Sequence, residues 1–481
     1  MSIAIKSFVT KYVKSLKEGN AAIFAGAGLS VGAGYVNWKN LLKDLAEEIE
    51  LDIDKEEHDL VGVAQYYCNE KKGRGEINQI IIEEFKNKAK ITENHRILSR
   101  LPIQTFWTTN YDTLIENSLE EANKIADIKI SEANLAITLP NRDAIVYKMH
   151  GDVSQVQHAV ITRDDYERYS ESHSLFTTAL KGDLVSKTFL FVGFSFNDPN
   201  LNYILSRVRI GLESNQRPHY CILKKVLREE FDNEENYIHA KVKQQLQIND
   251  LKRFSINTIF VNNYDEITDI LRDVEREFKK TNVFISGSAV EYGKFSENEA
   301  GEFLHDLSYK LVENKYKVIS GFGLGVGSYI INGVLQYAEV KKHNDVNDML
   351  LLKPFPQKES GGVSLPVLWD KYRKDMISSA GIAIFVFGNK NDNEGNVINA
   401  DGLQREFDIA RKNGVKIIAI GITGYQTKLI YDEIMSNFEQ YYPEKSDIKG
   451  LFEELSKEEN KDNLLEIIFN IISQFVEKPP V

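Results

Sequence analysis

Cysteine is scarce in this chain, since only Cys68 and Cys221 occur in 481 residues and no CxxC pair is present. A cysteine-rich structural zinc site is therefore excluded, and two distant cysteines provide no disulfide framework. His95, His158 and His173 lack partners at metal-ligand spacing. We expect these histidines to be surface residues and the protein to hold no metal.

Long hydrophobic runs are also missing, because no apolar stretch approaches the roughly 18 residues that a membrane-spanning helix needs. The first twenty residues form an amphipathic pattern with scattered lysines, unlike a secretory signal. We therefore expect a cytoplasmic protein without a membrane partner. An excess of positive charge is lacking too, since the formal net charge is −12. This balance argues against a nucleic-acid partner, because phosphate binding requires a basic surface.

What the chain does contain is an alternation of short apolar runs with amphipathic helical patterns. A length of 481 residues, with 42% apolar and 27% charged residues, is typical of a globular protein with more than one domain. Runs such as 21–24, 105–109 and 188–192 predict buried strands, and the alternation predicts a doubly wound parallel sheet. A second α/β pattern starts near Asn282. We therefore expect an α/β fold in two domains, at residues 1–275 and 281–481.

Four of the early strands end in glycine-rich or polar turns. These turns read GAGLS at 26–30, TTNYD at 108–112, HGD at 150–152 and GFSFND at 193–198. In a doubly wound sheet, ligands bind outside the carboxyl ends of the strands, so turns that are distant in the sequence meet there. Small residues in the first turn let backbone amides approach a phosphate, although a tight turn without a ligand would use the same residues.

Together the four turns resemble the catalytic core of the sirtuin family, over about residues 20 to 270. The resemblance implies NAD binding by a Rossmann-type sheet, with Asn110 at the nicotinamide ribose, Asp112 on the carboxamide and His150 as the base. Cleavage of the nicotinamide–ribose bond creates a positively charged centre that such polar groups can stabilise. The resemblance assigns catalysis to Asn110, His150 and Asp112, and NAD binding to Ala25, Gly26, Ala27, Gly28, Ser30, Asn110, Asp112, Gly193 and Ser195.

Each of these residues also has a purely structural interpretation. Asn110 and Asp112 stand directly before a predicted helix and are residue types that cap helices. His150 precedes a glycine and would suit a strand end without a chemical role. The run from Asn197 to Pro199 is typical of a turn. These alternatives stay open at the level of the sequence.

Three departures from the sirtuin pattern concern the reaction. The four-cysteine zinc module of protein-deacylating sirtuins is missing, and VGAGYVNW at 31–38 lacks their Pro-x-Phe-Arg stretch. Residues 109–112 read Thr-Asn-Tyr-Asp where deacylases usually have Gln-Asn-Ile-Asp. Without a path for an acylated lysine, water is the simplest acceptor, so we expect NAD hydrolysis to nicotinamide and ADP-ribose. A nucleotide-regulated protein deacylase is the alternative enzyme.

The second domain resembles the SLOG group of Rossmann-like nucleotide-binding domains. The resemblance rests on Ser-Gly-Ser at 286–288 after a strand and on GFGLGVG at 321–327 after another. Alternate glycines form a good phosphate cradle. Arg373 and Lys390 would neutralise the phosphates of the nucleotide, and Glu406 would bind its ribose hydroxyls. The residues expected to bind a nucleotide signal are Ser286, Gly287, Ser288, Gly321, Gly323, Leu324, Gly325, Gly327, Arg373, Lys390 and Glu406.

A sirtuin-like domain followed by a SLOG domain resembles the effectors of Thoeris antiphage defence. That resemblance implies a homotetrameric NADase, activated by a cyclic ADP-ribose isomer that a TIR-domain partner makes during infection. Depletion of NAD would then stop the growth of the infected cell. A second nucleotide site fits this role, because an unrestrained NADase would kill its host. A non-catalytic nucleotide sensor that leaves NAD intact is the remaining alternative.

Overall fold

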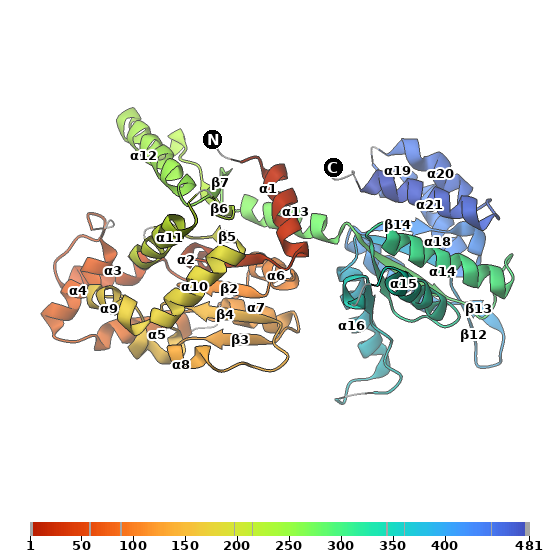
Figure 1. Cartoon of the computed structure of the whole chain (residues 1–481), viewed down its shortest axis with the longest axis horizontal. Helices are drawn as coiled ribbons and strands as arrows, with labels where there is room; N and C mark the ends of the chain where they lie inside the picture. The colour runs from red at the N-terminus through yellow and green to blue at the C-terminus, as the bar shows by residue number, and fades with distance from the viewer. Residues whose placement is uncertain are drawn as a thin grey trace. The chain divides into compact units, whose positions relative to one another are not determined.

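The chain forms two compact α/β units, Met1–Phe278 and Lys279–Val481 (Figure 1). The computed structural model describes residues 3–56, 59–86, 89–196, 198–213, 215–342, 345–359, 361–443 and 445–476. Each unit is built on a parallel sheet flanked by helices. The predicted α/β class with parallel sheets is confirmed.

The sheet of the first unit has seven parallel strands in the order β3-β4-β2-β1-β5-β6-β7. Its strands are β1 (Ala21–Ala25), β2 (Thr105–Thr108), β3 (Ala126–Lys129), β4 (Ala144–Lys148), β5 (Thr188–Val192), β6 (His219–Lys224) and β7 (Ile256–Val261). The edge strand β3 was not predicted, because its sequence ADIK contains no apolar run. Every residue of β1, β2 and β5 is buried, as expected for central strands that are covered on both faces.

Alternate side chains of the central strands enter two different cores. Ile23 of β1 packs with α1, α6, α7 and α13 on one face of the sheet. Phe24, the next residue, packs with α9, α10, α11 and α12 on the opposite face. This alternation follows from the two-residue period of a strand. The helices on the two faces of the sheet are α1 (Ile5–Lys17), α6 (Glu93–Arg100), α7 (Leu114–Glu121), α9 (Arg163–Ser172), α10 (Ser174–Ser186), α11 (Pro199–Leu212), α12 (Glu234–Lys252) and α13 (Glu266–Lys279).

A separate helical cluster forms the left end of the first unit in Figure 1. It consists of α3 (Trp38–Glu48), α4 (Leu60–Lys71) and α5 (Gly75–Lys86), which share a third apolar core with Tyr111 and Ile161. The short helices of the unit are α2 (Ala27–Val31), α8 (Glu132–Leu135), η1 (Val153–His158) and η2 (Arg228–Glu230). Since Tyr111 belongs to the TTNYD turn, the helical cluster packs directly on one of the predicted site turns.

The second unit contains a five-stranded parallel sheet in the order β10-β9-β8-β11-β14. These strands are β8 (Asn282–Ser288), β9 (Lys317–Ser320), β10 (Leu350–Leu352), β11 (Ile382–Phe387) and β14 (Lys416–Ala419). A short antiparallel hairpin, β12 (Asn389–Asn391) with β13 (Val397–Asn399), follows β11. The helices are α14 (Glu297–Glu313), α15 (Gly327–Val340), η3 (Val346–Asp348), α16 (Leu365–Ser378), α17 (Asp401–Lys412), η4 (Gly421–Thr423), α18 (Tyr425–Ser436), α19 (Phe438–Tyr441), η5 (Ser446–Ile448), α20 (Lys449–Glu454) and α21 (Lys461–Phe475).

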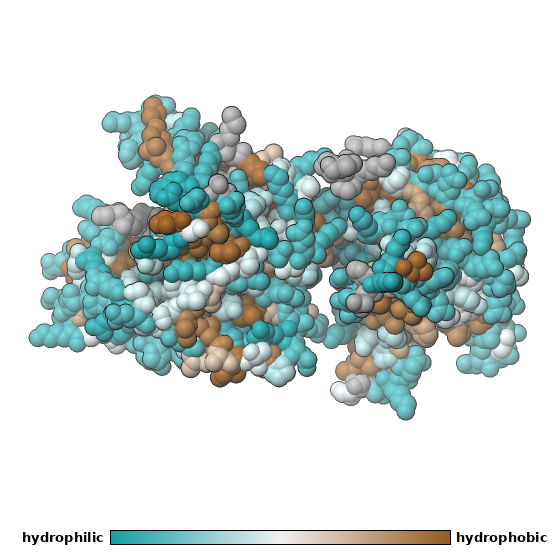
Figure 2. All heavy atoms as spheres, in the orientation of Figure 1, coloured by the Kyte–Doolittle hydropathy of each residue, from teal (hydrophilic) through white to brown (hydrophobic). Residues whose placement is uncertain are grey.

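Helix α12 carries a line of apolar side chains on its outer surface, which is visible as a brown stripe in Figure 2. Ile238, Val242 and Leu246 are spaced four residues apart and are 51%, 53% and 63% exposed. Residues at this spacing lie on one face of a helix. The surface of the first unit therefore includes a continuous apolar stripe.

Candidate functional site

The four turns that follow β4, β2, β1 and β5 lie side by side, because these four strands are consecutive neighbours in the sheet. The last residues of the strands are also in register. Ala25 pairs with both Thr108 and Val192, and Thr108 pairs with Lys148. The turns at 26–30, 109–112, 149–152 and 193–198 therefore start at the same edge of the sheet, as the sequence predicted.

The first glycine turn is packed against the last one by backbone contacts. The Gly26 amide donates to Val192 O at 3.0 Å, and the Gly28 amide donates to Gly193 O at 2.9 Å. A Cβ atom on Gly26 would lie 2.5 Å from Gly193 O, and one on Gly28 would lie 2.9 Å from Gly193 Cα. Gly193 itself has a φ of +65°, a conformation that favours glycine. These glycines are thus required for the turns to touch, independently of any ligand.

The Asn110 side chain points into the sheet edge and does not cap the helix that follows. Its amide nitrogen donates to Gly26 O at 3.1 Å and to the Ser30 hydroxyl at 3.0 Å. Its carbonyl oxygen is buried and has no hydrogen-bond partner among the described residues. A buried acceptor without a partner is costly, and such groups are typical of functional sites. The structure therefore favours a ligand-directed interpretation of Asn110 over helix capping.

Asp112 and Ser30 form a buried pair next to Asn110. The Ser30 hydroxyl donates to Asp112 Oδ2 at 2.8 Å, while Asp112 Oδ1 accepts from the Leu114 amide at 3.0 Å. One Asp112 oxygen therefore binds a backbone amide at the start of α7, while the other contacts Ser30 beside Asn110. Ala27 is half-buried and Gly28 is exposed, whereas Ser195 lies on the surface after β5.

His150 is buried at the end of β4 and faces an acidic residue that the sequence analysis treated as part of a turn. The imidazole Nε2 lies 3.1 Å from Oδ2 of Asp198. The other carboxylate oxygen of Asp198 accepts from the Leu201 amide at 2.7 Å and so caps α11. Asn197, the neighbour that was also assigned to this turn, lies outside the described residues. The pairing of His150 with Asp198 was missed, because about fifty residues separate them in the sequence.

A second unforeseen residue is Lys148, whose side chain is 0% exposed. Its ammonium group contacts the carboxylates of Glu116 and Asp152 and the backbone oxygen of Asp112. Burial alone would lower the pKa of Lys148, but the carboxylates of Glu116, Asp152 and Asp112 outweigh burial and raise it. Lys148 therefore remains charged and joins the turn that contains Asn110 to the turn that contains His150.

Replacement of Lys148 by methionine is expected to destabilise the first unit by roughly 3–5 kcal/mol, because it leaves Glu116 and Asp152 buried without their cation. Denaturant unfolding of the purified variant measures this loss. Lys225, an exposed residue directly after β6, provides the matched control, and Lys225→Met is expected to change the free energy of unfolding by less than about 0.5 kcal/mol. Equal stability of the two variants would contradict the role assigned to Lys148.

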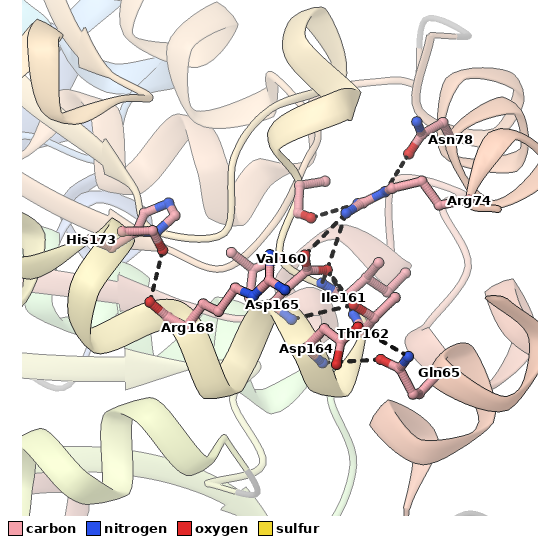
Figure 3. A network of polar contacts seen from close by, with 12 residues as sticks. Gln65, Arg74, Asn78, Val160, Ile161, Thr162, Asp164, Asp165, Arg168 and His173 are labelled. Atoms are coloured by element: carbon pink, nitrogen blue, oxygen red, sulfur yellow. Dashed lines mark hydrogen bonds and ion pairs between the residues drawn. The ribbon is translucent and has the colours of Figure 1, made fainter. Parts of the chain in front are cut away.

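The helix beside His150 is anchored to the helical cluster by Arg74, as Figure 3 shows. The Arg74 guanidinium donates to Asp165 at 3.1 and 3.2 Å and to Ala159 O at 2.6 Å. Asp165 also completes a capping box with Thr162 at the start of α9. A second contact joins Gln65 of α4 to the backbone amide of Asp164 at 3.0 Å. These contacts fix the position of α9.

The prediction that His95 is a surface residue is wrong. His95 is 2% exposed, and its Nδ1 lies 2.7 Å from the Thr92 hydroxyl. Burial lowers the pKa of His95 to about 4, so the ring is neutral at physiological pH. His95 occupies α6, whose apolar residues repeat on one face, and its burial follows from its position on that face. His158 is exposed and His173 is half-buried against Tyr169.

In the second unit, three of the predicted signal-binding residues form one buried cluster. The Ser286 hydroxyl donates to Glu406 Oε2 at 2.6 Å, and the Arg373 Nε donates to Glu406 Oε1 at 3.3 Å. The guanidinium of Arg373 also lies 5.0 Å from the ring centre of Phe355. Burial raises the pKa of Glu406, although Ser286 and Arg373 oppose the rise. Arg373 is thus no ordinary surface charge but a buried cation paired with Glu406.

The glycine turn after β9 packs tightly on the turn after β8. A Cβ atom on Gly323 would overlap the backbone oxygen of Gly287, and one on Gly325 would overlap that of Ala289. The Ala289 amide donates to Leu324 O at 2.8 Å. The Leu324 side chain is exposed, and Gly321 and Gly327 complete the same turn.

Lys390 lies apart from the Ser286–Arg373–Glu406 cluster, on the first strand of the β12–β13 hairpin. Its ammonium group pairs with Asp401, the first residue of α17, and its side chain is half exposed. Ser288 connects the hairpin to the sheet, since its hydroxyl donates to Asn389 O at 3.0 Å. The hairpin therefore places Lys390 near the start of the helix that bears Glu406, without direct contact between the two.

The described part of the chain was also searched for metal sites and for membrane-spanning helices. No group of three or more histidine, cysteine, aspartate or glutamate side chains in it is arranged to hold a metal ion. None of its helices combines the length and the apolar character that crossing a membrane requires.

Comparison with protein families identifies a domain in each unit. Residues 104–243 match the SIR2-like domain, and residues 266–475 match the Sir2- and TIR-associating SLOG family. The first match contains the turns of Asn110, His150 and Gly193. The second contains the Ser286–Arg373–Glu406 cluster. The predicted order of a sirtuin-like domain followed by a SLOG domain is confirmed.

Comparison with individual proteins finds similarity over the whole chain. The chain is 50% identical to the NAD(+) hydrolase ThsA of Bacillus cereus over 479 residues, which covers 99% of both chains. It is 47% identical to the NAD(+) hydrolase ThsA of Enterococcus faecium, over 98% of this chain and 99% of the relative. A more distant relative is the defense-associated sirtuin 2 of Bacillus subtilis, which is 26% identical over 208 residues. The aligned region covers 42% of this chain and 20% of that protein.

Proposed function

The chain belongs to the ThsA family of NAD(+) hydrolases, and we propose that its first unit cleaves NAD when the second unit binds a cyclic ADP-ribose isomer. As a family member the chain is an NAD(+) hydrolase. The proposal divides the work between residues 1–275, for hydrolysis, and residues 281–481, for signal binding. It adds to the family activity the identity of the activator and the roles of particular residues.

The observation that carries the catalytic part is the unpartnered carbonyl oxygen of Asn110. Its amide is held by Gly26 and Ser30, so the oxygen has a fixed direction at the edge where the four turns meet. In the proposed reaction a water oxygen bonds to the anomeric carbon of the nicotinamide ribose. The carbon–nitrogen bond breaks, and its electron pair leaves with nicotinamide. Asn110 positions the water, Asp112 holds the carboxamide, and His150 accepts a proton from a ribose hydroxyl or from the water.

The backbone of the turn at 25–28, with Ser30, Gly193 and Ser195, is proposed to hold the rest of the dinucleotide. Backbone amides in glycine-rich turns suit a diphosphate, and the neighbouring turns at 26–30 and 193–195 supply them from two strands. No metal is assigned a role in this reaction. The amide, carboxylate and imidazole groups suffice to position and deprotonate the reactants.

Product analysis tests the reaction assigned to the first unit. Purified protein incubated with NAD and activator is expected to release nicotinamide and linear ADP-ribose in equal amounts, as measured by liquid chromatography and mass spectrometry. A cyclic product, which is lighter than ADP-ribose by one water, would show that an internal hydroxyl is the acceptor. Transfer of an acyl group from an added acyl-lysine peptide would support the deacylase alternative.

The signal site is proposed to be formed by the SLOG turns together with Arg373, Lys390 and Glu406. Support comes from the buried Arg373–Glu406 pair, since a guanidinium presents fixed donors that match a phosphate. Burial also raises the pKa of Glu406, so the charge of this carboxylate is less stable than that of an exposed one, which favours replacement of Glu406 by a phosphate as the partner of Arg373. The proposed signal-binding set is Ser286, Gly287, Ser288, Gly321, Gly323, Leu324, Gly325, Gly327, Arg373, Lys390 and Glu406.

The biological setting proposed for this switch is antiphage defence of the Thoeris type, in the cytoplasm of the infected cell. A TIR-domain partner would make the cyclic ADP-ribose isomer, and NAD depletion would then stop growth. The name of the family matched by the second unit, Sir2- and TIR-associating SLOG, supports a TIR partner. A relative named as a defense-associated sirtuin supports the defence role.

A homotetramer is proposed as the working form of the protein. The exposed stripe of Ile238, Val242 and Leu246 on α12 supports self-association, because exposed apolar surfaces of this kind commonly become buried in an interface. Sedimentation of the purified chain at several concentrations tests the proposal, and a monomer at all of them would contradict it.

A further inference from the structure

We propose that Asp198 is a positioning residue for NAD hydrolysis, which orients the His150 imidazole and stabilises its protonated form. The inference rests on the proposed role of His150 as the base and extends it to Asp198, a residue of the last turn to which the sequence analysis assigned no catalytic role. It assigns two functions to one carboxylate. One oxygen caps a helix, and the other faces the catalytic ring.

The geometry around Asp198 separates these two functions. Oδ1 accepts from the Leu201 amide at 2.7 Å, so the backbone of α11 fixes the carboxylate. Oδ2 lies 3.1 Å from His150 Nε2 and accepts from the Tyr166 hydroxyl at 3.2 Å. Burial alone would raise the pKa of Asp198. The charge of His150 and the hydrogen bonds that Asp198 accepts outweigh burial and lower that pKa, so the carboxylate is ionised.

Both ring nitrogens of His150 are buried and make no hydrogen bond among the described residues, and of the two only Nε2 has an ion-pair contact there, to Asp198. One side of the ring is thus next to a carboxylate, while the other side is left without a protein partner. A base that is held through one nitrogen can exchange a proton through the other, because the carboxylate stabilises the imidazolium that forms. The arrangement assigns Nε2 to orientation and Nδ1 to proton transfer.

The groups that face His150 come from two directions. Asp198 lies before α11, whereas Tyr166 and Tyr169 belong to α9 and pack with their rings 5.5 and 6.2 Å from the imidazole centre. The Tyr169 hydroxyl donates to Met149 O at 3.0 Å and is thereby fixed. His173 follows α9 and interacts electrostatically with His150. Among these groups Asp198 is the only carboxylate, and it is the one within ion-pair distance of the ring.

The test compares Asp198→Asn with Asp59→Asn in the full-length protein, over a range of pH. Asparagine keeps the acceptor that caps α11 and replaces the charged oxygen beside His150 and Tyr166 with a neutral amide nitrogen. Asp59 is matched to Asp198, because it caps α4 through the Gly62 amide and pairs its other oxygen with Arg163 at 2.7 Å. We expect Asp198→Asn to lower kcat for NAD at least roughly 10-fold, with little change in KM. The acidic limb of its pH–rate profile is expected to move to lower pH by about one unit, and Asp59→Asn is expected to match wild type.

Several outcomes would overturn the inference. An unchanged rate and profile, or a lower rate with an unmoved acidic limb, would limit Asp198 to a structural role. A higher kcat of Asp198→Asn would show that Asp198 inhibits proton transfer by His150 instead of orienting the ring for it. Nitrogen NMR shifts of the His150 ring, in wild type and in Asp198→Asn, test the pair without turnover. If the pH at which the His150 ring shifts change differs between wild type and Asp198→Asn, the His150–Asp198 interaction is supported. This result does not depend on NAD hydrolysis. Absence of NAD hydrolysis by the wild type would contradict the proposed function and not this inference.

Discussion

Replacement of Asn110 by alanine is expected to lower NAD hydrolysis at least about 100-fold while signal binding remains intact. The reason lies in the fixed geometry of the amide, which Gly26 and Ser30 hold while its carbonyl oxygen stays free for the reacting groups. Loss of one such preorganised group typically costs a factor of about 100 to 1,000 in rate. Nicotinamide release, measured at saturating activator, gives the rate.

The matched control for this variant is Asn117→Ala. Asn117 is an exposed asparagine on α7 that contacts only Thr113, at 3.2 Å. Calorimetric titration with the activator should give the same affinity for wild type and both variants, because the altered residues belong to the first unit. Wild-type turnover by Asn110→Ala would remove Asn110 from the catalytic residues.

Replacement of Arg373 by alanine is expected to have the second large effect, a weakening of activator affinity by roughly 10- to 100-fold. A hydrogen bond to a charged group contributes about 1.5–3 kcal/mol, and Arg373 is the buried cation of the proposed signal site. Removal also leaves Glu406 without its cationic partner, although the raised pKa of Glu406 allows it to become neutral. Dose–response curves of NAD hydrolysis against activator measure the shift.

Lys374→Ala is the control for Arg373→Ala. Lys374 is the next residue on α16, is exposed, and pairs with Asp370 within the same helix. Its loss is expected to leave the dose–response curve unchanged. A normal response of Arg373→Ala would refute the assignment of the Ser286–Arg373–Glu406 cluster to signal binding.

Much of the fold was accessible from the sequence, because its central strands are continuous apolar runs with glycine-rich or polar residues at their ends. Strands β1 and β5 are uniformly buried, and such runs are readily recognised. Strands β3 and β12 escaped prediction because neither contains an apolar run. β3 reads ADIK, and β12 reads NKN. Their conformation depends on pairing with a neighbouring strand, which local sequence does not encode.

The residues of the candidate site also differ in whether the local sequence identifies them. Asn110, Asp112 and His150 were predicted as site residues because each lies just after a strand, in a turn that resembles a known motif. Asp198 and Lys148 were not, because their importance depends on which distant residues they approach. Lys148 stands inside a strand and was treated as part of it, and Asp198 was treated as part of a turn. Only the three-dimensional arrangement shows that both contact the predicted catalytic turns.

The most direct test of the central claim is NAD consumption by the purified full-length protein, with and without individual cyclic ADP-ribose isomers. Wild type, Asn110→Ala and Arg373→Ala are compared in the same assay. The account predicts that one isomer triggers release of nicotinamide and ADP-ribose by wild type, that Asn110→Ala releases almost none, and that Arg373→Ala does not respond at the activator concentration that half-activates wild type. NAD that stays intact with every isomer, or equal NAD loss by wild type and Asn110→Ala, would contradict it.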